Sequence, residues 1–199
     1  MDTTQNRRTR RRFMVLLAAG LAVVSITAGA TSLALFTSAT TVTANTFSTG
    51  TVILTTSPAS ALITFSAMAP GDQVTAPVTV TNAGSLNLRY AISSVATNAD
   101  AKGLKDQLVL TIKSGVTTCT NAQFGATGTV LYTGDLDSSA GKLVGDNTTG
   151  AQAGDRSLAA AGSEVLCFNA SLPLATGNAF QSATTTATFT FAAEQTANN

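Results

Sequence analysis

Gln73 to Thr81 reads QVTAPVTVT, and its apolar residues recur at every second position. This period of two is typical of a β-strand with one face on a core and the other in water. The apolar face consists of Val74, Ala76, Val78 and Val80. Pro77 has no N–H to donate to a ladder, so we expect a sheet edge or a bulge at that position.

The same alternation predicts strands along most of the chain after residue 47. We expect them at 50–56, 61–66, 88–96, 107–113, 129–133, 164–172 and 186–193. Turn residues separate these segments, and only 100–106 has a helical pattern. The Gly-, Asp- and Ser-rich span 135–162 is predicted to be a long exposed excursion. About eight short strands favour an all-β fold, an antiparallel jelly-roll-type β-sandwich over residues 47–199.

The composition agrees with a single exported domain. Of the 199 residues, 11% are charged and 44% hydrophobic, and the chain has no Trp and no His. Five of its 11 basic residues lie in the first twelve positions. Beyond Ala34, six basic residues stand against nine acidic ones, a net charge of −3. A mildly acidic domain lacks the basic surface that nucleic-acid binding needs, so we expect no nucleic-acid partner.

Residues 1–34 have the pattern of a signal peptide. The basic start is followed by an apolar run, FMVLLAAGLAVVSI, at 13–26. Ser32 and Ala34 supply the small side chains that signal peptidase requires before the Ala34–Leu35 bond. Ala28-Gly29-Ala30 offers a competing cleavage site. The other reading is a retained membrane anchor, since the apolar run approaches the roughly 20 residues that span a bilayer.

The stretch that follows, Leu35 to Leu54, reads LFTSATTVTANTFSTGTVIL and is uncharged. Its first part, 35–46, places Phe36, Val42 and Ala44 on one side of an extended chain, where they could fill apolar pockets. Three interpretations are open. The segment is an arm that adds to another subunit, the first strand of its own sheet, or a frayed tail.

Several short motifs in the first half resemble the TasA/camelysin (CalY) family of secreted biofilm-matrix fibre proteins, which carry a SipW-type signal peptide. The motifs are the signal end Ala34-Leu35-Phe36, the segment NTFSTGTVIL at 45–54, MAPGD at 68–72 and VTNAGSL at 80–86. Their turn residues are Gly50, Pro70, Gly71, Asp72, Asn82 and Gly84. The match covers about residues 12–94, and the second half rests on strand pattern.

This resemblance implies a jelly-roll subunit that polymerises by donor-strand exchange. In that arrangement the arm 35–46 of one subunit, with Leu35, Phe36, Val42 and Ala44, completes a sheet of the next subunit. Main-chain hydrogen bonds supply the affinity, and alternate side chains set the register. Head-to-tail contacts that do not close produce a filament. The partner is then a second copy of the chain, with an accessory or anchoring matrix protein as a further expected partner.

The sequence argues against catalysis. Without His, neither a Ser-His-Asp triad nor an H-E-x-x-H zinc site can form. This bears on the metalloprotease label that the camelysin branch carries. Asp135 and Asp137 could contact a hard cation, but we favour solvated loop residues, and we interpret Asp72 as a turn residue. We therefore expect no enzyme activity, no metal and no cofactor.

Cys119 and Cys167 are the chain's two cysteines. In an exported protein such a pair favours one disulfide, and two buried thiols are the alternative.

The sequence thus predicts a secreted structural protein, a fibre or thin-pilus subunit in the extracellular matrix or on the cell surface of a Gram-positive bacterium. The precursor meets the membrane and signal peptidase through its signal segment. The rival predictions are a monomeric membrane-anchored surface adhesin or binding module and a camelysin-type metalloprotease.

Overall fold

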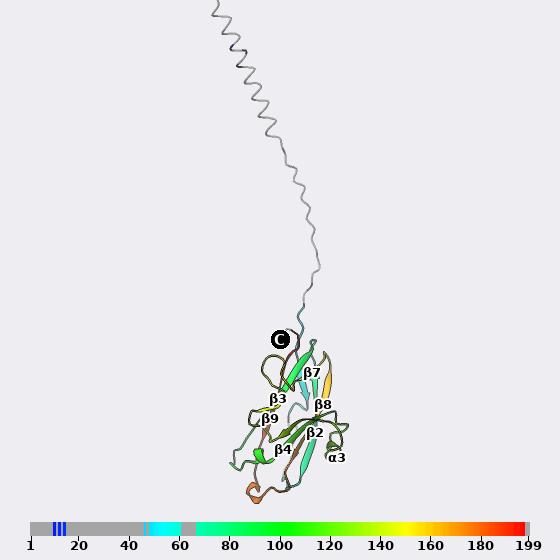
Figure 1. The fold of residues 1–199 in the computed structure, drawn as a ribbon, viewed down its shortest axis with the longest axis vertical. Coiled ribbons are helices and arrows are strands. Elements are labelled where there is room, and N and C mark those ends of the chain that lie inside the picture. The colour runs from blue at the N-terminus through cyan, green and yellow to red at the C-terminus, as the bar shows by residue number, and fades with distance from the viewer. Residues whose placement is uncertain are drawn as a thin grey trace, which may run out of the picture. The chain divides into compact units, whose positions relative to one another are not determined.

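Two antiparallel β-sheets make up the folded part of the chain in a computed structural model (Figure 1). The structure describes residues 48–60 and 67–197, together with Arg10, Arg12, Met14 and Thr46. Residues from Ser48 onward belong to one compact unit. The predicted all-β antiparallel sandwich is confirmed. The predicted signal peptide and the arm 35–46 lie outside the described residues, apart from the isolated positions named above.

The first sheet has five strands in the order β1-β2-β8-β4-β5. Their bounds are β1 Leu54–Ser57, β2 Gln73–Asn82, β8 Ser163–Ser171, β4 Val109–Ser114 and β5 Thr129–Gly134. The quoted stretch is therefore β2, an interior strand. Because β1 ends opposite Thr79, no described strand pairs with β2 on that side at Pro77, so the missing N–H costs no ladder bond.

The second sheet is built around β3 (Leu88–Ala96). Two three-residue strands, β6 (Lys142–Val144) and β7 (Arg156–Leu158), pair with one side of β3, and β9 (Ala187–Gln195) pairs with it along its whole length. In Figure 1, β3 and β9 lie side by side, next to the β2, β4 and β8 layer. Along the described strands the chain changes sheet five times, after β2, β3, β5, β7 and β8.

The core lies between the two sheets and follows the predicted alternation. Val78 and Val80 of β2 are 2% and 0% exposed, and Leu110, Ile112, Leu166 and Phe168 are fully buried. From the second sheet come Leu88, Tyr90 and Ile92, all at most 1% exposed. Period-two patterning therefore identified the inward face of β2 and β4, whereas β3 and β8 are buried over several consecutive residues and show no such alternation.

Two expectations need correction. The span 135–162 is not simply an exposed excursion, because it contains β6 and β7 and buries Leu143, Val144 and Leu158. Strands of three residues are too short to show alternation. The strand predicted at 50–56 is β1, which begins at Leu54, and the one predicted at 61–66 lies outside the described residues. The helical pattern at 100–106 corresponds to the four-residue helix α2 (Leu104–Gln107).

A loop fastened by a disulfide covers the outer face of the five-stranded sheet. Cys119 and Cys167 are bonded, which confirms the predicted pair, with their Cα atoms 5.4 Å apart. Helix α3 (Asn121–Phe124) follows Cys119, and its Phe124 is 7% exposed. Lys113 of β4 lies over the Phe124 ring, 4.7 Å from its centre, and donates to the Phe124 carbonyl at 2.7 Å.

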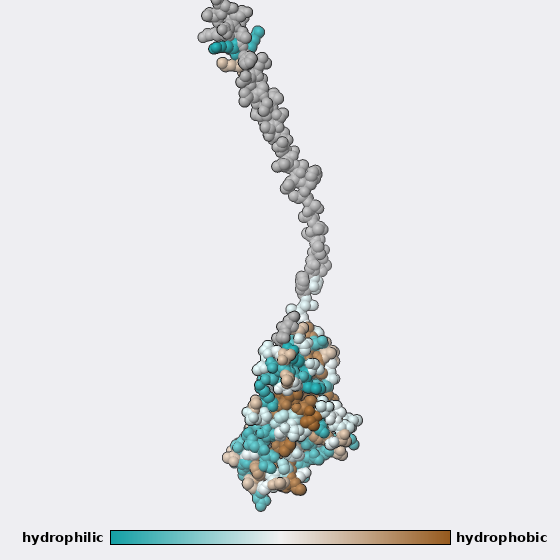
Figure 2. Space-filling view, in the orientation of Figure 1, coloured by the Kyte–Doolittle hydropathy of each residue, from teal (hydrophilic) through white to brown (hydrophobic). Residues whose placement is uncertain are grey.

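The surface is mostly polar, with apolar side chains gathered at a few places in the view of Figure 2. Val95, Val130, Val165 and Leu174 are the large apolar side chains most exposed on the folded unit, at 46–82%. Among the described residues, no helix has the length and apolar character needed to cross a membrane.

Candidate functional site

The residues expected to act in assembly fall into two groups. The predicted cleavage site Ala34–Leu35 and the arm residues Leu35, Phe36, Val42 and Ala44 lie outside the described part of the chain. All six motif turn residues are described, and they form two junctions at the ends of the sandwich.

The first junction, here called the N-terminal clamp, joins residues 50–53 to residues 82–86. Thr51 N donates to Ser85 Oγ at 3.0 Å, and Thr51 O accepts from Ser85 N at 3.0 Å and from Leu86 N at 3.2 Å. Ile53 O accepts from Ala83 N at 2.8 Å. The segment that leads out of the arm is therefore held by main-chain bonds before β1 begins.

Asn82 organises this clamp from inside. Its side chain is fully buried, and Nδ2 donates to the carbonyls of Leu86 at 2.8 Å and Ala159 at 3.0 Å. Oδ1 accepts from Gly84 N at 3.0 Å. A buried amide with its donors and acceptor all used is stabilising, whereas losing it would leave several backbone groups unpaired.

The two clamp glycines allow the close approach of the chains. A Cβ on Gly84 would overlap the Thr51 carbonyl oxygen and lie 2.8 Å from Ile53 N, and a Cβ on Gly50 would overlap the Leu86 side chain. The sequence motifs at 45–54 and 80–86 therefore belong to one structural feature. Gly50 and Gly84 are needed for space, since neither has the positive φ that a left-handed turn requires.

The second junction is the Pro70-Gly71-Asp72 turn, which closes against the end of β8. Gly71 N donates to Leu172 O at 2.8 Å, and Leu172 N donates to Asp72 O at 2.9 Å. Asp72 Oδ2 accepts from Ala69 N at 2.7 Å, as predicted for a turn aspartate. Gly71 has φ +96°, a conformation that favours glycine.

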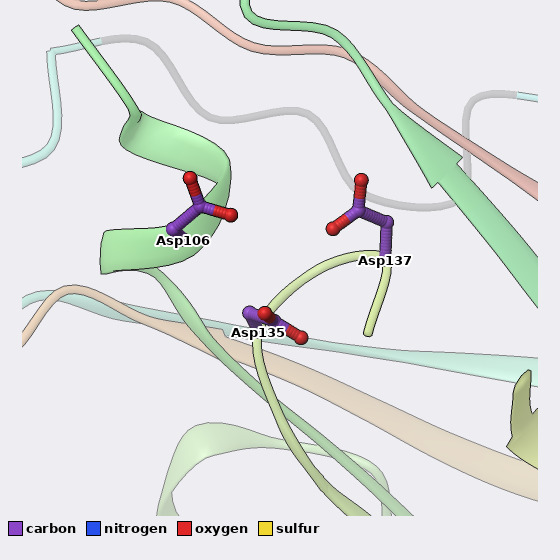
Figure 3. A group of neighbouring side chains, drawn as sticks. All are labelled: Asp106, Asp135 and Asp137. Atoms are coloured by element: carbon purple, nitrogen blue, oxygen red, sulfur yellow. The ribbon is translucent and has the colours of Figure 1, made fainter. Parts of the chain in front are cut away.

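A carboxylate cluster is the place where a cation could bind. Asp106 of α2 and Asp135 and Asp137 of the loop after β5 turn toward one another (Figure 3), with carboxylate oxygens within 4.8 Å. The sequence suggested Asp135 and Asp137 but missed Asp106, which is distant in sequence. The expectation of solvated loop residues is wrong in part, because both loop aspartates are half-buried and make hydrogen bonds.

A lysine already binds two carboxylates of this cluster and offsets part of its charge. Lys105 Nζ lies 2.9 Å from Asp106 Oδ1 and 3.1 Å from Asp137 Oδ2, and these two hydrogen bonds raise the pKa of Lys105. Asp135 Oδ1 accepts from Ser138 N at 2.8 Å and from the Tyr132 hydroxyl at 3.1 Å. Burial and that hydrogen bond raise the pKa of Tyr132 to about 12.

These residues do not fit a peptidase zinc. Catalytic zinc sites use His ligands, alone or with Cys or carboxylate ligands, and keep an open position for water. The chain has no His, both cysteines are in the disulfide, and two of the three described carboxylates, Asp106 and Asp137, already bind the Lys105 ammonium group. No hydrolytic step can be derived from them.

A pocket of about 230 Å³ lies on the outer side of β3 and β9, beneath residues 146–149 and Asp155. Arg89, 7% exposed, lines it and donates through Nε to Glu194 Oε1 at 2.5 Å, while its Nη2 has no hydrogen-bond partner. Glu194 Oε1 also accepts from Gly150 N at 3.0 Å. A polar floor with one unsatisfied donor could hold a small acceptor group.

A half-buried ion pair between the sheets was not predicted. Arg156 of β7 donates to Glu164 of β8, and the Tyr90 hydroxyl of β3 donates to Glu164 Oε1 at 2.7 Å. Glu164 has the same parity as the core residues Leu166 and Phe168. A charge at a core position is the sequence signal that could have revealed a buried partner.

Comparison with known families gives one match. A family model described as camelysin metallo-endopeptidase matches residues 9–199. The match includes the second half of the chain, where the sequence offered strand pattern alone. A search among curated proteins found no match.

Proposed function

The chain belongs to the camelysin family, and we propose that it is a structural subunit of an extracellular matrix fibre or thin pilus, assembled by donor-strand exchange. The N-terminal clamp is the observation that carries the proposal. It fixes Thr51 at one end of the sandwich through main-chain hydrogen bonds, and this supports the interpretation of residues 35–46 as a distinct arm. Export and removal of residues 1–34 would release this arm at Leu35.

The lack of a fitting zinc site among the described residues supports a structural role over a peptidase. A secreted chain of this kind has a second copy of itself as its main partner, signal peptidase as a transient one, and an accessory or anchoring matrix protein at the fibre end. Neither nucleic acid nor a cofactor has a place in this function. The location is the matrix or surface of a Gram-positive bacterium.

Deleting residues 35–46 tests the proposal. The exported variant should keep the far-ultraviolet β-sheet spectrum of the parent but form no fibres in negative-stain electron microscopy. A matched control replaces the loop residues Ser139 and Ala140, which are exposed, with glycines and should polymerise normally. Fibres of ordinary morphology from the deletion variant would exclude the arm as the assembly element.

The second candidate is a membrane-anchored surface binding module. The pocket with Arg89 Nη2 is the observation that favours it. This candidate predicts an uncleaved N-terminus in the membrane fraction, whereas the fibre subunit begins at Leu35 or close to it. N-terminal sequencing of the protein from cells therefore separates the two.

A further inference from the structure

We propose that the outer edge of β9 is the acceptor for residues 35–46 of a second copy, which add to it as an antiparallel strand. The inference rests on the proposed function and specifies which edge receives the arm and in which direction.

Hydrogen bonds at the two ends of β9 show which of its residues bond to β3 and which direct their backbone groups away from it. Thr97 N donates to Thr186 O at 2.9 Å, and Thr196 N donates to Asn87 O at 3.1 Å. In an antiparallel ladder, hydrogen-bonded positions alternate with positions whose backbone groups point away. The even-numbered residues of β9 therefore bond to β3. Ala187, Phe189, Phe191 and Ala193 direct their N–H and C=O groups outward, where no described strand pairs with them.

This edge differs from the others in length and chemistry. β9 has nine residues, whereas the other edge strands among the described residues have three to six: β1, β5, β6 and β7. From Ala187 to Ala193 it reads ATFTFAA, with no charge and no Pro. Lys, Pro, bulges and short length are what natural proteins use to block edges, and this one has none of them.

The side chains beneath the edge are incompletely covered. Phe189 and Phe191 pack against the core, with the Phe189 ring centre 5.3 Å from that of Phe168, but both remain half-exposed. A strand added beside them would bury this apolar surface. Phe36, Val42 and Ala44 would share one face of an arm added as a strand, so their side chains would extend the core past Phe189 and Phe191.

The distance that the chain can span decides whether the antiparallel strand on β9 comes from the same copy or from a neighbouring one. The clamp holds Thr51 beside Leu86, next to the end of the sheet where Leu88 pairs with Gln195. An antiparallel arm along all of β9 would put Thr46 beside Ala187, about 27 Å away at about 3.3 Å per strand residue. The five steps from Thr46 to Thr51 span at most about 18 Å.

A copy's own arm could therefore lie along β9 only as a parallel strand. Every pairing between the described strands is antiparallel, and antiparallel pairing is slightly more stable per residue. A second copy has no such linker limit, and its arm can enter from the opposite end. Because the same edge then accepts and the same arm donates in each subunit, the chain of contacts continues without closing.

Disulfide cross-linking between two exported variants tests this. One variant carries Thr188→Cys, Thr190→Cys or Ala192→Cys on the solvent face of β9, and the other carries a cysteine at one of the odd arm positions from Thr37 to Asn45. A cross-link between differently tagged chains can form only between copies. For an antiparallel arm, the arm position that links best moves toward Leu35 as the β9 cysteine moves from 188 to 192.

The matched control places the cysteine at Thr133, which is exposed on the edge strand β5. We expect cross-links to β9 and none to Thr133. Fibres that form but link through Thr133, or link to β9 with the opposite order of positions, would overturn the inference and leave fibre formation intact. A protein that forms no fibres and no cross-links would overturn both proposals.

A second variant blocks the edge without cysteines. Ala193→Pro removes one outward N–H and leaves the β3 ladder intact, so the folded subunit should keep its Tm while polymerisation is lost. Ala192→Pro removes a bond to β3 and should lower the Tm instead. Normal fibres from Ala193→Pro would contradict the proposed acceptor edge.

Discussion

The hydroxyl of Tyr90 in one sheet donates to Glu164 Oε1 in the other at 2.7 Å, and this bond links the two layers inside the sandwich. Arg156 holds the same carboxylate from the side. Burial and, second, the hydrogen bond to Glu164 raise the pKa of Tyr90 well above its ordinary value. The phenol of Tyr90 therefore stays neutral in the folded protein at an alkaline pH at which it would already be ionised in the unfolded chain.

This raised pKa predicts a loss of stability at high pH. Below the unfolded-state pKa of about 10, Tyr90 is neutral in both states and its contribution is complete. Above it the unfolded state releases a proton that the folded state keeps, so the free energy of unfolding falls as the pH rises. Urea titrations from pH 8 to 11 should show this fall, and Tyr90→Phe should reduce it.

At pH 7 the same substitution should lower the free energy of unfolding by about 1 kcal/mol, the typical worth of one hydrogen bond. The chain has two tyrosines, and the pKa of Tyr132 is raised as well, to about 12, so Tyr132→Phe should also reduce the alkaline fall and is titrated in parallel with Tyr90→Phe. An unchanged pH profile in Tyr90→Phe would show that Tyr90 is not the residue responsible.

Gly84→Ala should destabilise the N-terminal clamp, because its Cβ would overlap the Thr51 carbonyl. We expect a loss of about 1–3 kcal/mol, the usual cost of overpacking, and increased proteolysis before β1. Limited proteolysis followed by N-terminal sequencing measures the second effect. Gly125→Ala is the control, because a Cβ there meets nothing within 4 Å and the backbone is right-handed helical. Equal stability of the two variants would refute the proposed role of Gly84.

Removing the disulfide should cost about 3–4 kcal/mol on the chain-entropy estimate, since Cys119 and Cys167 are separated by 48 residues. Both cysteines are replaced by alanine and not by serine, because Cys167 is fully buried and a serine would place a hydroxyl group in that position. Chemical denaturation with and without reductant gives the measurement. Reductant should destabilise the parent and leave the double variant unchanged, and a destabilised double variant in reductant would point to another cause.

Divalent metal ions should leave the protein unaffected. Lys105 already binds Asp106 and Asp137, and a divalent ion would have to displace its ammonium group to reach both carboxylates, so Zn²⁺ or Ca²⁺ gains little from this cluster. A ligand that does not bind the folded state does not raise its Tm, so differential scanning fluorimetry with each ion and with chelator should give one value. A Tm increase with zinc, or chelator-sensitive cleavage of a protein substrate by the pure protein, would revive the peptidase alternative.

Much of the fold could be predicted because local pattern and burial agree. Val78 and Val80 alternate with threonines, and Leu110 and Ile112 flank Thr111 on β4, so these two strands carry the identity of their buried face in the sequence. The three-residue strands β6 and β7 could not be predicted, since they form only because β3 offers them a partner edge.

The candidate site divides in the same way. The sequence motifs identified Gly50, Asn82 and Gly84 as turn residues. That these three residues meet in one clamp could not be predicted from the sequence. Lys105 and Asp106 are neighbours in the sequence, but they meet Asp135 and Asp137 only through folding. Pairwise contacts between distant residues have no local pattern from which to infer them.

The sequence by itself determined the all-β character, the parity of the core, the disulfide pair and the absence of a histidine-based catalytic centre. These follow from residue type and spacing, which are local properties. Tertiary structure alone decided that β9 lies at an edge, where no described strand pairs with the outward backbone groups of residues 187–193, and that Thr51 is held at the far end of that strand. Both depend on which strands become neighbours, and the free energy of that choice comes from contacts across the whole sandwich.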